Sequence, residues 1–143
     1  MITQSDVDRV LAANPLITAE GFEHGWKKTR PEYVPASVNI REMQGAVDWL
    51  EKADRRVSVN TTCSSYGLKH IAEKTVDPIL KHLVERWAWE SKRDDVTRYI
   101  SNGAFIAAAY YLGFDVRRIN GGPNAHINIS NKSVRKLRAA NLV

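Results

Sequence analysis

The sequence predicts an α+β protein that is mostly helical, with a helical bundle around one apolar helix at about 102–112. The stretch from Ala104 to Leu112 carries no charged or strongly polar side chain. A helix there has no polar stripe and is expected to be buried on most sides. After this stretch the spacing of apolar residues changes from about 3.6, as in a helix, to 2, as in a strand. This change predicts a C-terminal β-hairpin. A final basic helix completes the fold.

The length of 143 residues suits a single domain, 1–143, with a core of its own. Hydrophobic residues make up 43% and charged residues 26%, as in soluble globular proteins. No apolar run reaches membrane-spanning length. The start, MITQSDVDRV, lacks the features of a signal peptide, so we expect a cytoplasmic protein. Cys63 is the one cysteine and cannot form an internal disulfide.

The first third of the chain predicts one clear helix and an irregular segment. A cap at Thr3 or Ser5 begins a helix that ends before Asn14-Pro15. Glycines and prolines interrupt residues 16–36, for which we expect a packed loop with a short helix near 18–27.

Three further elements are predicted before residue 75. Asn39 with Glu42 has the form of a capping box, and apolar residues then follow at helical spacing over 40–53. Alternation over 57–61 indicates a short strand, with an extended linker of the same pattern as the alternative. Ser64 or Ser65 starts the next helix, SSYGLKHIAEK.

The segment after residue 75 predicts two helices. An acidic cap followed by proline, Asp77-Pro78, begins a helix that continues to about Glu90. The central helix has Ser101 or Asn102 as its cap, and Gly113 takes the left-handed conformation that ends it.

The C-terminal end predicts a hairpin and a helix. Strands at about 115–119 and 125–129 flank a turn rich in Asn, Gly and Pro. Ser130 or Asn131 then caps a helix with Val134 facing inward and basic residues facing outward.

Positive charge is concentrated at this end. The whole chain carries +5 and the segment from Arg117 onward carries +6 with no acidic residue, which leaves −1 for residues 1–116. Such segregation favours an anionic partner, although a solvated face that keeps the protein soluble remains the alternative. The candidate contact residues are Arg117, Arg118, Asn120, Asn124, Lys132, Arg135, Lys136 and Arg138, joined by Arg55 and Arg56 if the 57–61 strand pairs beside the hairpin.

A core helix followed by a basic hairpin is similar to the winged-helix arrangement, whose hairpin contacts the phosphate backbone. The preceding helix here has no side chain able to contact base edges, so we expect backbone binding without base-specific recognition, with DNA favoured over RNA. The alternative is a protein partner: the basic face binds an acidic surface, or an exposed tryptophan inserts into a pocket. Trp49 and Trp89 lie off the apolar lines of their helices, with core burial the other interpretation.

Catalytic and metal-binding patterns are weak. Cys63 with His70 or His126 as base is a possible nucleophilic pair that no spacing selects. His70 and Glu73 share a helix face but lack a second pair of metal ligands. We expect a non-enzymatic protein with no cofactor and no metal.

Two stretches, CSSYGLKHIAE and YISNGAFIAAAYYLGF, resemble paired stretches in small uncharacterised proteins of prophages and other bacterial mobile elements. The resemblance implies a bacterial or phage setting, in which small proteins regulate, bind nucleic acid or block host defence complexes. It identifies no catalytic or binding residue. The leading hypothesis is a nucleic-acid-binding protein, and the second is an inhibitor of a host defence or nucleic-acid-processing complex.

Overall fold

The computed structural model describes residues 1–24, 32–74 and 99–139. These residues form five helices and two short antiparallel hairpins, β1–β2 and β3–β4. In chain order they are α1 (Gln4–Ala13), β1 (Ile17–Thr18), β2 (Gly21–Phe22), α3 (Ile40–Leu50), α4 (Ser65–Glu73), α6 (Asn102–Tyr111), β3 (Val116–Arg118), β4 (Ala125–Ile127) and α7 (Asn131–Ala139). The predicted fold class is confirmed. The helix predicted after Asp77-Pro78 lies outside the described residues.

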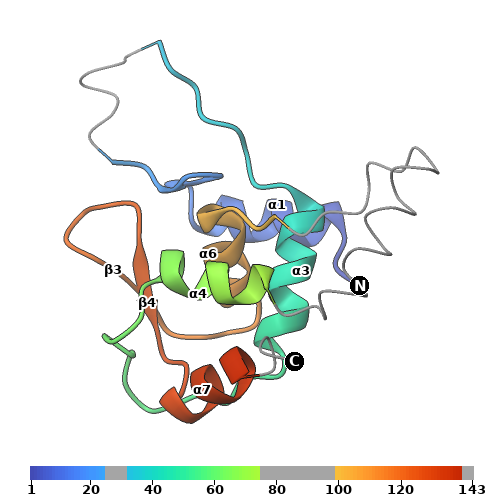
Figure 1. Cartoon of the computed structure of the whole chain (residues 1–143). Coiled ribbons are helices and arrows are strands. Elements are labelled where there is room, and N and C mark those ends of the chain that lie inside the picture. The colour runs from blue at the N-terminus through green and yellow to red at the C-terminus, as the bar shows by residue number, and fades with distance from the viewer. Residues whose placement is uncertain (25–31, 75–98, 140–143) are drawn as a thin grey trace.

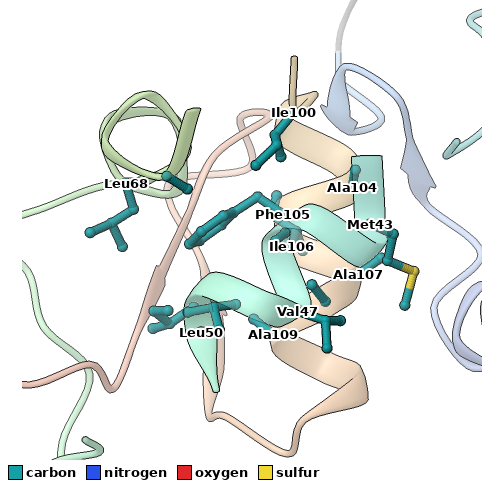
Figure 2. Close-up of a cluster of buried hydrophobic side chains, with 14 of the residues drawn as sticks. Met43, Val47, Leu50, Leu68, Ile100, Ala104, Phe105, Ile106, Ala107 and Ala109 are labelled. Atoms are coloured by element: carbon teal, nitrogen blue, oxygen red, sulfur yellow. The ribbon is translucent and has the colours of Figure 1, made fainter. Parts of the chain in front are cut away.

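Helix α6 lies at the centre of the fold, as predicted. It contacts α1, α3, α4 and three of the four strands, and Figure 1 shows it among them. Every residue from Ala104 to Ala109 is fully buried. Figure 2 shows Phe105 and its neighbours on α6 packed beside apolar side chains of α3 and α4. The Phe105 ring centroid lies 6.0 Å from that of Trp49.

Both ends of α6 have the expected caps. The Ser101 hydroxyl accepts a hydrogen bond from the Ala104 amide over 3.1 Å, so Ser101 is the N-cap. At the other end Gly113 has a φ of 81°, and the Phe114 amide donates to the Ala109 carbonyl over 2.9 Å. This is a Schellman motif, and it directs Phe114 back into the core.

The short helix predicted near 18–27 is wrong over its described part, where β1 and β2 form a hairpin instead. The reason is a close approach of two backbones. The Gly103 amide donates to the Ala19 carbonyl over 3.1 Å, and a Cβ at Gly103 would lie 1.6 Å from the Thr18 carbonyl oxygen. Gly21 has a φ of 112°, a backbone conformation that is unfavourable for any residue other than glycine.

The strand predicted over 57–61 is also wrong. The amides of Arg56 and Asn60 donate, over 2.7 and 2.8 Å, to carbonyls at and just after the end of β4. Between these two anchors the Val57 side chain is fully exposed. Alternation therefore marked a segment that runs beside β4 without forming a strand.

The remaining boundaries differ little from those predicted. Helix α3 ends at Leu50, three residues earlier than expected, and the strands of the C-terminal hairpin are shorter, at 116–118 and 125–127. Ser130 caps α7, because its hydroxyl accepts from the Ser133 amide over 3.1 Å.

Candidate functional site

The outward face of α7 gathers four of the ten predicted contact residues. Ser133 and Val134 are 5% and 4% exposed and attach the helix to the body. The Ser133 hydroxyl also accepts a hydrogen bond from the Asp54 amide over 2.8 Å. At 100° per residue, the basic side chains fall within an arc of about 160° on the other side. They are Lys132, Arg135, Lys136 and Arg138, all exposed.

The charge of this face is uncompensated. None of the four side chains forms an ion pair or hydrogen bond with any residue in 1–24, 32–74 or 99–139. Helix α7 itself, NKSVRKLRA, contains no acidic residue. Four positive charges therefore stand on a helix of nine residues, about 13 Å long.

The two arginines of β3 have different environments. Arg117 is exposed and lies opposite His126 in the hairpin register. Arg118 is bound within the protein. It donates over 2.8 and 2.7 Å to two carbonyls of the hairpin turn, donates to the Glu23 carbonyl, and lies 5.3 Å above the Phe22 ring. Arg118 therefore fastens the hairpin turn to β2.

Arg55 and Arg56 do lie beside the hairpin, although no strand brings them there. The Arg55 guanidinium lies 4.5 Å above the Phe114 ring and donates to the Leu112 carbonyl, which secures the C-terminal end of α6. Arg56 is exposed, with one hydrogen bond of 3.2 Å to Ser58. Arg56 thus remains available to a partner, whereas Arg55 is engaged.

The two turn asparagines also separate. Asn120 is exposed and has a φ of 48°, a conformation that Asn tolerates in a turn. The Asn124 side-chain oxygen accepts a hydrogen bond from the side-chain nitrogen of Asn102 over 2.9 Å. Asn124 therefore helps to hold the turn against α6.

The catalytic candidates are not brought together. Cys63 is half-buried, and the nearest polar side-chain contact is the Thr62 hydroxyl at 3.9 Å. His70 Nδ1 lies 3.1 Å from a Glu73 oxygen, and its ring meets that of Tyr66 edge-on at 4.5 Å. Among the described residues no three His, Cys, Asp or Glu side chains form a metal-binding group.

Trp49 belongs to the core, being 2% exposed, so it is no anchor for a partner. The other three tryptophans lie outside the described residues.

A cleft of about 1050 Å³ lies at the N-terminal end of α6, where the sequence predicted no site. It opens between α4, the β1–β2 turn, the segment before α3 and the C-terminal hairpin turn. Three tyrosines line it, Tyr33, Tyr66 and Tyr99, with 37%, 52% and 59% of their surface exposed. The polar lining includes Glu20, His24, Asn39, Glu42, Lys69, Ser101, Asn102 and Asn124.

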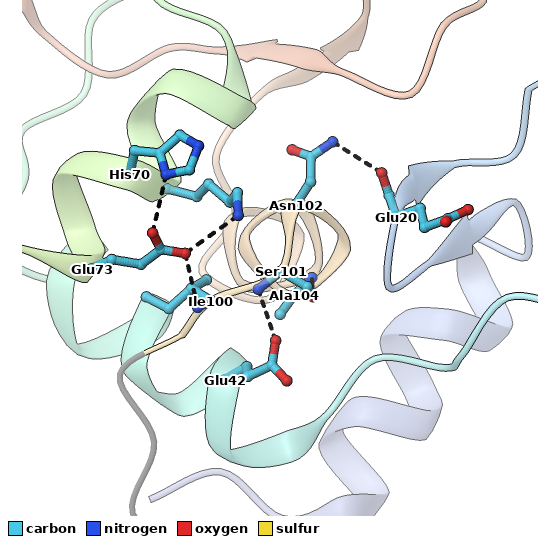
Figure 3. A network of polar contacts seen from close by, with 9 residues as sticks. Glu20, Glu42, His70, Glu73, Ile100, Ser101, Asn102 and Ala104 are labelled. Atoms are coloured by element: carbon cyan, nitrogen blue, oxygen red, sulfur yellow. Dashed lines mark hydrogen bonds and ion pairs between the residues drawn. The ribbon is translucent and has the colours of Figure 1, made fainter. Parts of the chain in front are cut away.

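Two carboxylates, those of Glu73 and Glu42, hold the chain that enters α6, as Figure 3 shows, and Glu42 also lines the cleft. One Glu73 oxygen accepts from the Ile100 amide over 3.1 Å and from the Lys69 ammonium over 3.3 Å. A Glu42 oxygen accepts from the Ser101 amide over 2.8 Å. Negative charge at a helix N-terminus is stabilising. In the sequence, the three-residue spacing of His70 and Glu73 indicated that both lie on one helix face. It did not indicate that Glu73 binds the chain at the start of α6.

Comparison with known proteins adds no relative. No family model matches the chain, and no curated protein or solved structure matches it. Within the described ranges, no helix is both long and apolar enough to cross a membrane.

Proposed function

We propose that the protein binds the phosphate backbone of nucleic acid, DNA in preference, through the outward face of α7. The observation that carries the proposal is the set of four exposed cations on one face of α7 without an ion-pair partner in the described chain. Unpaired Lys and Arg side chains at short helical spacing are suited to phosphate contacts. Arg117, Arg56 and Asn120 are exposed and complete the proposed contact set.

Arg118, Arg55 and Asn124 are left out of this set because their polar groups are engaged within the protein. Helix α6, which directly precedes the hairpin, is buried from Asn102 to Ala109 and so presents no polar side chain there to base edges. The proposed binding is therefore independent of sequence, which suits a small regulator in the mobile-element setting that the resemblance implies.

Fluorescence anisotropy with a labelled DNA duplex, a single strand and an RNA duplex, titrated at several salt concentrations, tests the proposal. Affinity is expected to fall with salt at a slope of about −0.9 per neutralised phosphate, hence about −3 to −4 for α7 alone. Absence of binding at low salt contradicts the proposal and leaves an acidic protein surface as the partner to be sought.

The double variant Arg135→Glu with Lys136→Glu is expected to abolish DNA binding and keep the parent melting temperature. The matched control is Lys52→Glu with Lys74→Glu, which changes net charge equally at exposed positions outside α7. Equal weakening in both variants would mean that total charge matters and the face of α7 does not.

A further inference from the structure

We propose that the cleft at the N-terminal end of α6 binds an organic cation, an alkylammonium or guanidinium group. The cleft is separate from α7: Figure 1 shows α7 at the foot of the molecule and the β1–β2 hairpin, which lines the cleft, near the top. This site is therefore independent of the proposed nucleic-acid surface.

The aromatic lining suits a cation. The Lys69 ammonium lies near both Tyr66 and Tyr99, with its nitrogen 5.3 and 4.7 Å from the two ring centroids. Their π faces thus already attract one positive charge within the protein. The two tyrosine residues nevertheless remain 52% and 59% exposed to solvent. Tyr33 adds a third ring to the same cleft.

The charge of the lining is negative. Lys69 is neutralised by Glu73. Glu42 accepts from the Ser101 amide over 2.8 Å, and Glu20 accepts from the Tyr33 hydroxyl over 2.7 Å. Neither Glu20 nor Glu42 has a cation as partner among the described residues, so within this part of the chain both carboxylates of the cleft lack an ion pair.

Asn102 places a buried hydrogen-bond acceptor on the same wall of the cleft, and no described residue donates to this acceptor. Asn102 is 5% exposed and lines the cleft. Its side-chain nitrogen faces three acceptors, the Glu20 and Pro123 carbonyls and the Asn124 oxygen, at 3.3, 3.1 and 2.9 Å. These fix the orientation of the side-chain amide, and no described residue donates a hydrogen bond to its oxygen Oδ1. A buried unpaired acceptor is costly, and an N–H donor relieves it.

The same contacts argue against an anionic ligand. Of the backbone amides where α6 begins, those of Ile100, Ser101 and Gly103 donate to Glu73, Glu42 and the Ala19 carbonyl, so these three are not available to a phosphate or carboxylate. The lining groups that act on a ligand in this proposal are the Glu20 and Glu42 carboxylates, the Asn102 side-chain oxygen and the exposed parts of the Tyr66 and Tyr99 side chains. All of them favour a positively charged hydrogen-bond donor, supplied either by a free amine or by a Lys or Arg side chain of a peptide.

Isothermal titration calorimetry with small probes, supported by NMR of the tyrosine rings and the Asn102 amide, tests this site. The probes are n-butylammonium, tetramethylammonium and ethylguanidinium, with n-butanol and butyrate as neutral and anionic controls. Cationic probes are expected to bind and to shift the resonances of Tyr66, Tyr99 and Asn102. Equal binding of n-butanol, or no shift with any cation, overturns the proposal.

Variants in the cleft distinguish a loss of ligand binding from a loss of folding stability. Glu20→Gln, at an exposed turn, and Tyr99→Leu are each expected to weaken n-butylammonium binding by about threefold or more at an unchanged melting temperature. Controls outside the cleft, Glu51→Gln and Tyr111→Leu, are expected to bind as the parent does. Unchanged affinity in both cleft variants overturns the proposal.

The peptide acetyl-Gly-Lys-Gly-amide distinguishes the source of the cation. Affinity about tenfold above that of n-butylammonium supports a protein segment as the ligand, because backbone contacts then add to the ammonium contacts. Affinity equal to that of n-butylammonium supports a free amine. Failure of the peptide and of every small cation to bind excludes the site and leaves the nucleic-acid proposal untouched.

Discussion

Gly103 shows how a single missing side chain sets the position of two elements. Ala is normally the better helix residue, by about 1 kcal/mol. Here a Cβ would lie 1.6 Å from the Thr18 carbonyl oxygen, with that backbone fixed by its own hairpin. Gly103→Ala is therefore expected to destabilise the protein by about 2–3 kcal/mol in urea denaturation, as an overpacked core does.

The matched control is Gly67→Ala in α4. A Cβ there meets one atom within 4 Å, the Ser64 hydroxyl oxygen at 3.8 Å. This substitution is expected to be neutral or to stabilise by up to about 1 kcal/mol. A Gly103→Ala variant as stable as the parent would show that β1–β2 does not pack on α6 in solution.

Residue by residue, burial was more predictable than the engagement of charges. The absence of polar residues from Ala104 to Leu112 was sufficient to predict a buried helix. Nothing in the sequence distinguished Arg118, bonded to three carbonyls, from its exposed neighbour Arg117. Two of these carbonyls, those of Gly121 and Gly122, belong to the adjacent turn, but the third, that of Glu23, lies 95 positions away in the chain. Such long-range contacts leave no local pattern.

At the scale of elements, a substitution at the C-terminal end of α6 tests the cost of a left-handed backbone conformation without disturbing side-chain packing. Gly113 has a φ of 81°, and a Cβ there would meet its nearest neighbour, Arg55, at 3.8 Å. Space is thus available, and the cost of a side chain is that of the left-handed backbone, about 1 kcal/mol for Ala.

Chemical denaturation of Gly113→Ala and Gly113→Asn checks this reasoning. Asn tolerates the left-handed conformation, so its variant is expected to lose less stability than the Ala variant. Equal losses would indicate that contacts of the Schellman motif, and not backbone conformation, set the cost.

The N-terminal end of α1 has a capping box that responds to acid. The backbone amide of Thr3 donates to the Asp6 carboxylate over 2.8 Å and, with the Thr3 hydroxyl, holds the pKa of Asp6 below 3.8, its ordinary value. A carboxyl with a lowered folded-state pKa stabilises the fold above its unfolded pKa, and that contribution is lost as the pH falls through the folded-state value.

Asp6→Asn is therefore expected to lower the melting temperature slightly at neutral pH and to show a smaller loss than the parent between about pH 4 and pH 2. Thermal melts monitored by circular dichroism across this range provide the measurement. Parallel pH profiles of the parent and variant would contradict the role of the Asp6 carboxylate.

Elements with clear end signals were predicted well, and those without were not. Caps at Thr3, Asn39, Ser64 and Ser101 were recognisable because they act within three residues. The β1–β2 hairpin and the segment beside β4 were missed, since their hydrogen bonds depend on distant backbone. The cleft was missed for the same reason: its lining comes from segments between residues 19 and 124.

At the scale of the whole molecule, α6 is the element on which the other described elements converge. Its residues from Ala104 to Ala109 are fully buried and contact helices and strands on several sides. An unpaired carboxylate placed there has neither water nor a cation to stabilise it. Ala108→Glu is therefore expected to abolish cooperative folding, which thermal denaturation and one-dimensional NMR would detect.

The control for this prediction lies on the same helix. Tyr111 is 39% exposed at the last turn, so Tyr111→Glu places the same carboxylate in water and is expected to cost about 1 kcal/mol or less. Net charge changes equally in both variants, and their helix propensities differ by less than about 1 kcal/mol, so burial dominates the difference between them. If Ala108→Glu melts within a few degrees of Tyr111→Glu, the core of the protein is not centred on α6. The placement of the cleft at its N-terminal end would then also be lost, because the residues of the cleft are held together by the start of this helix.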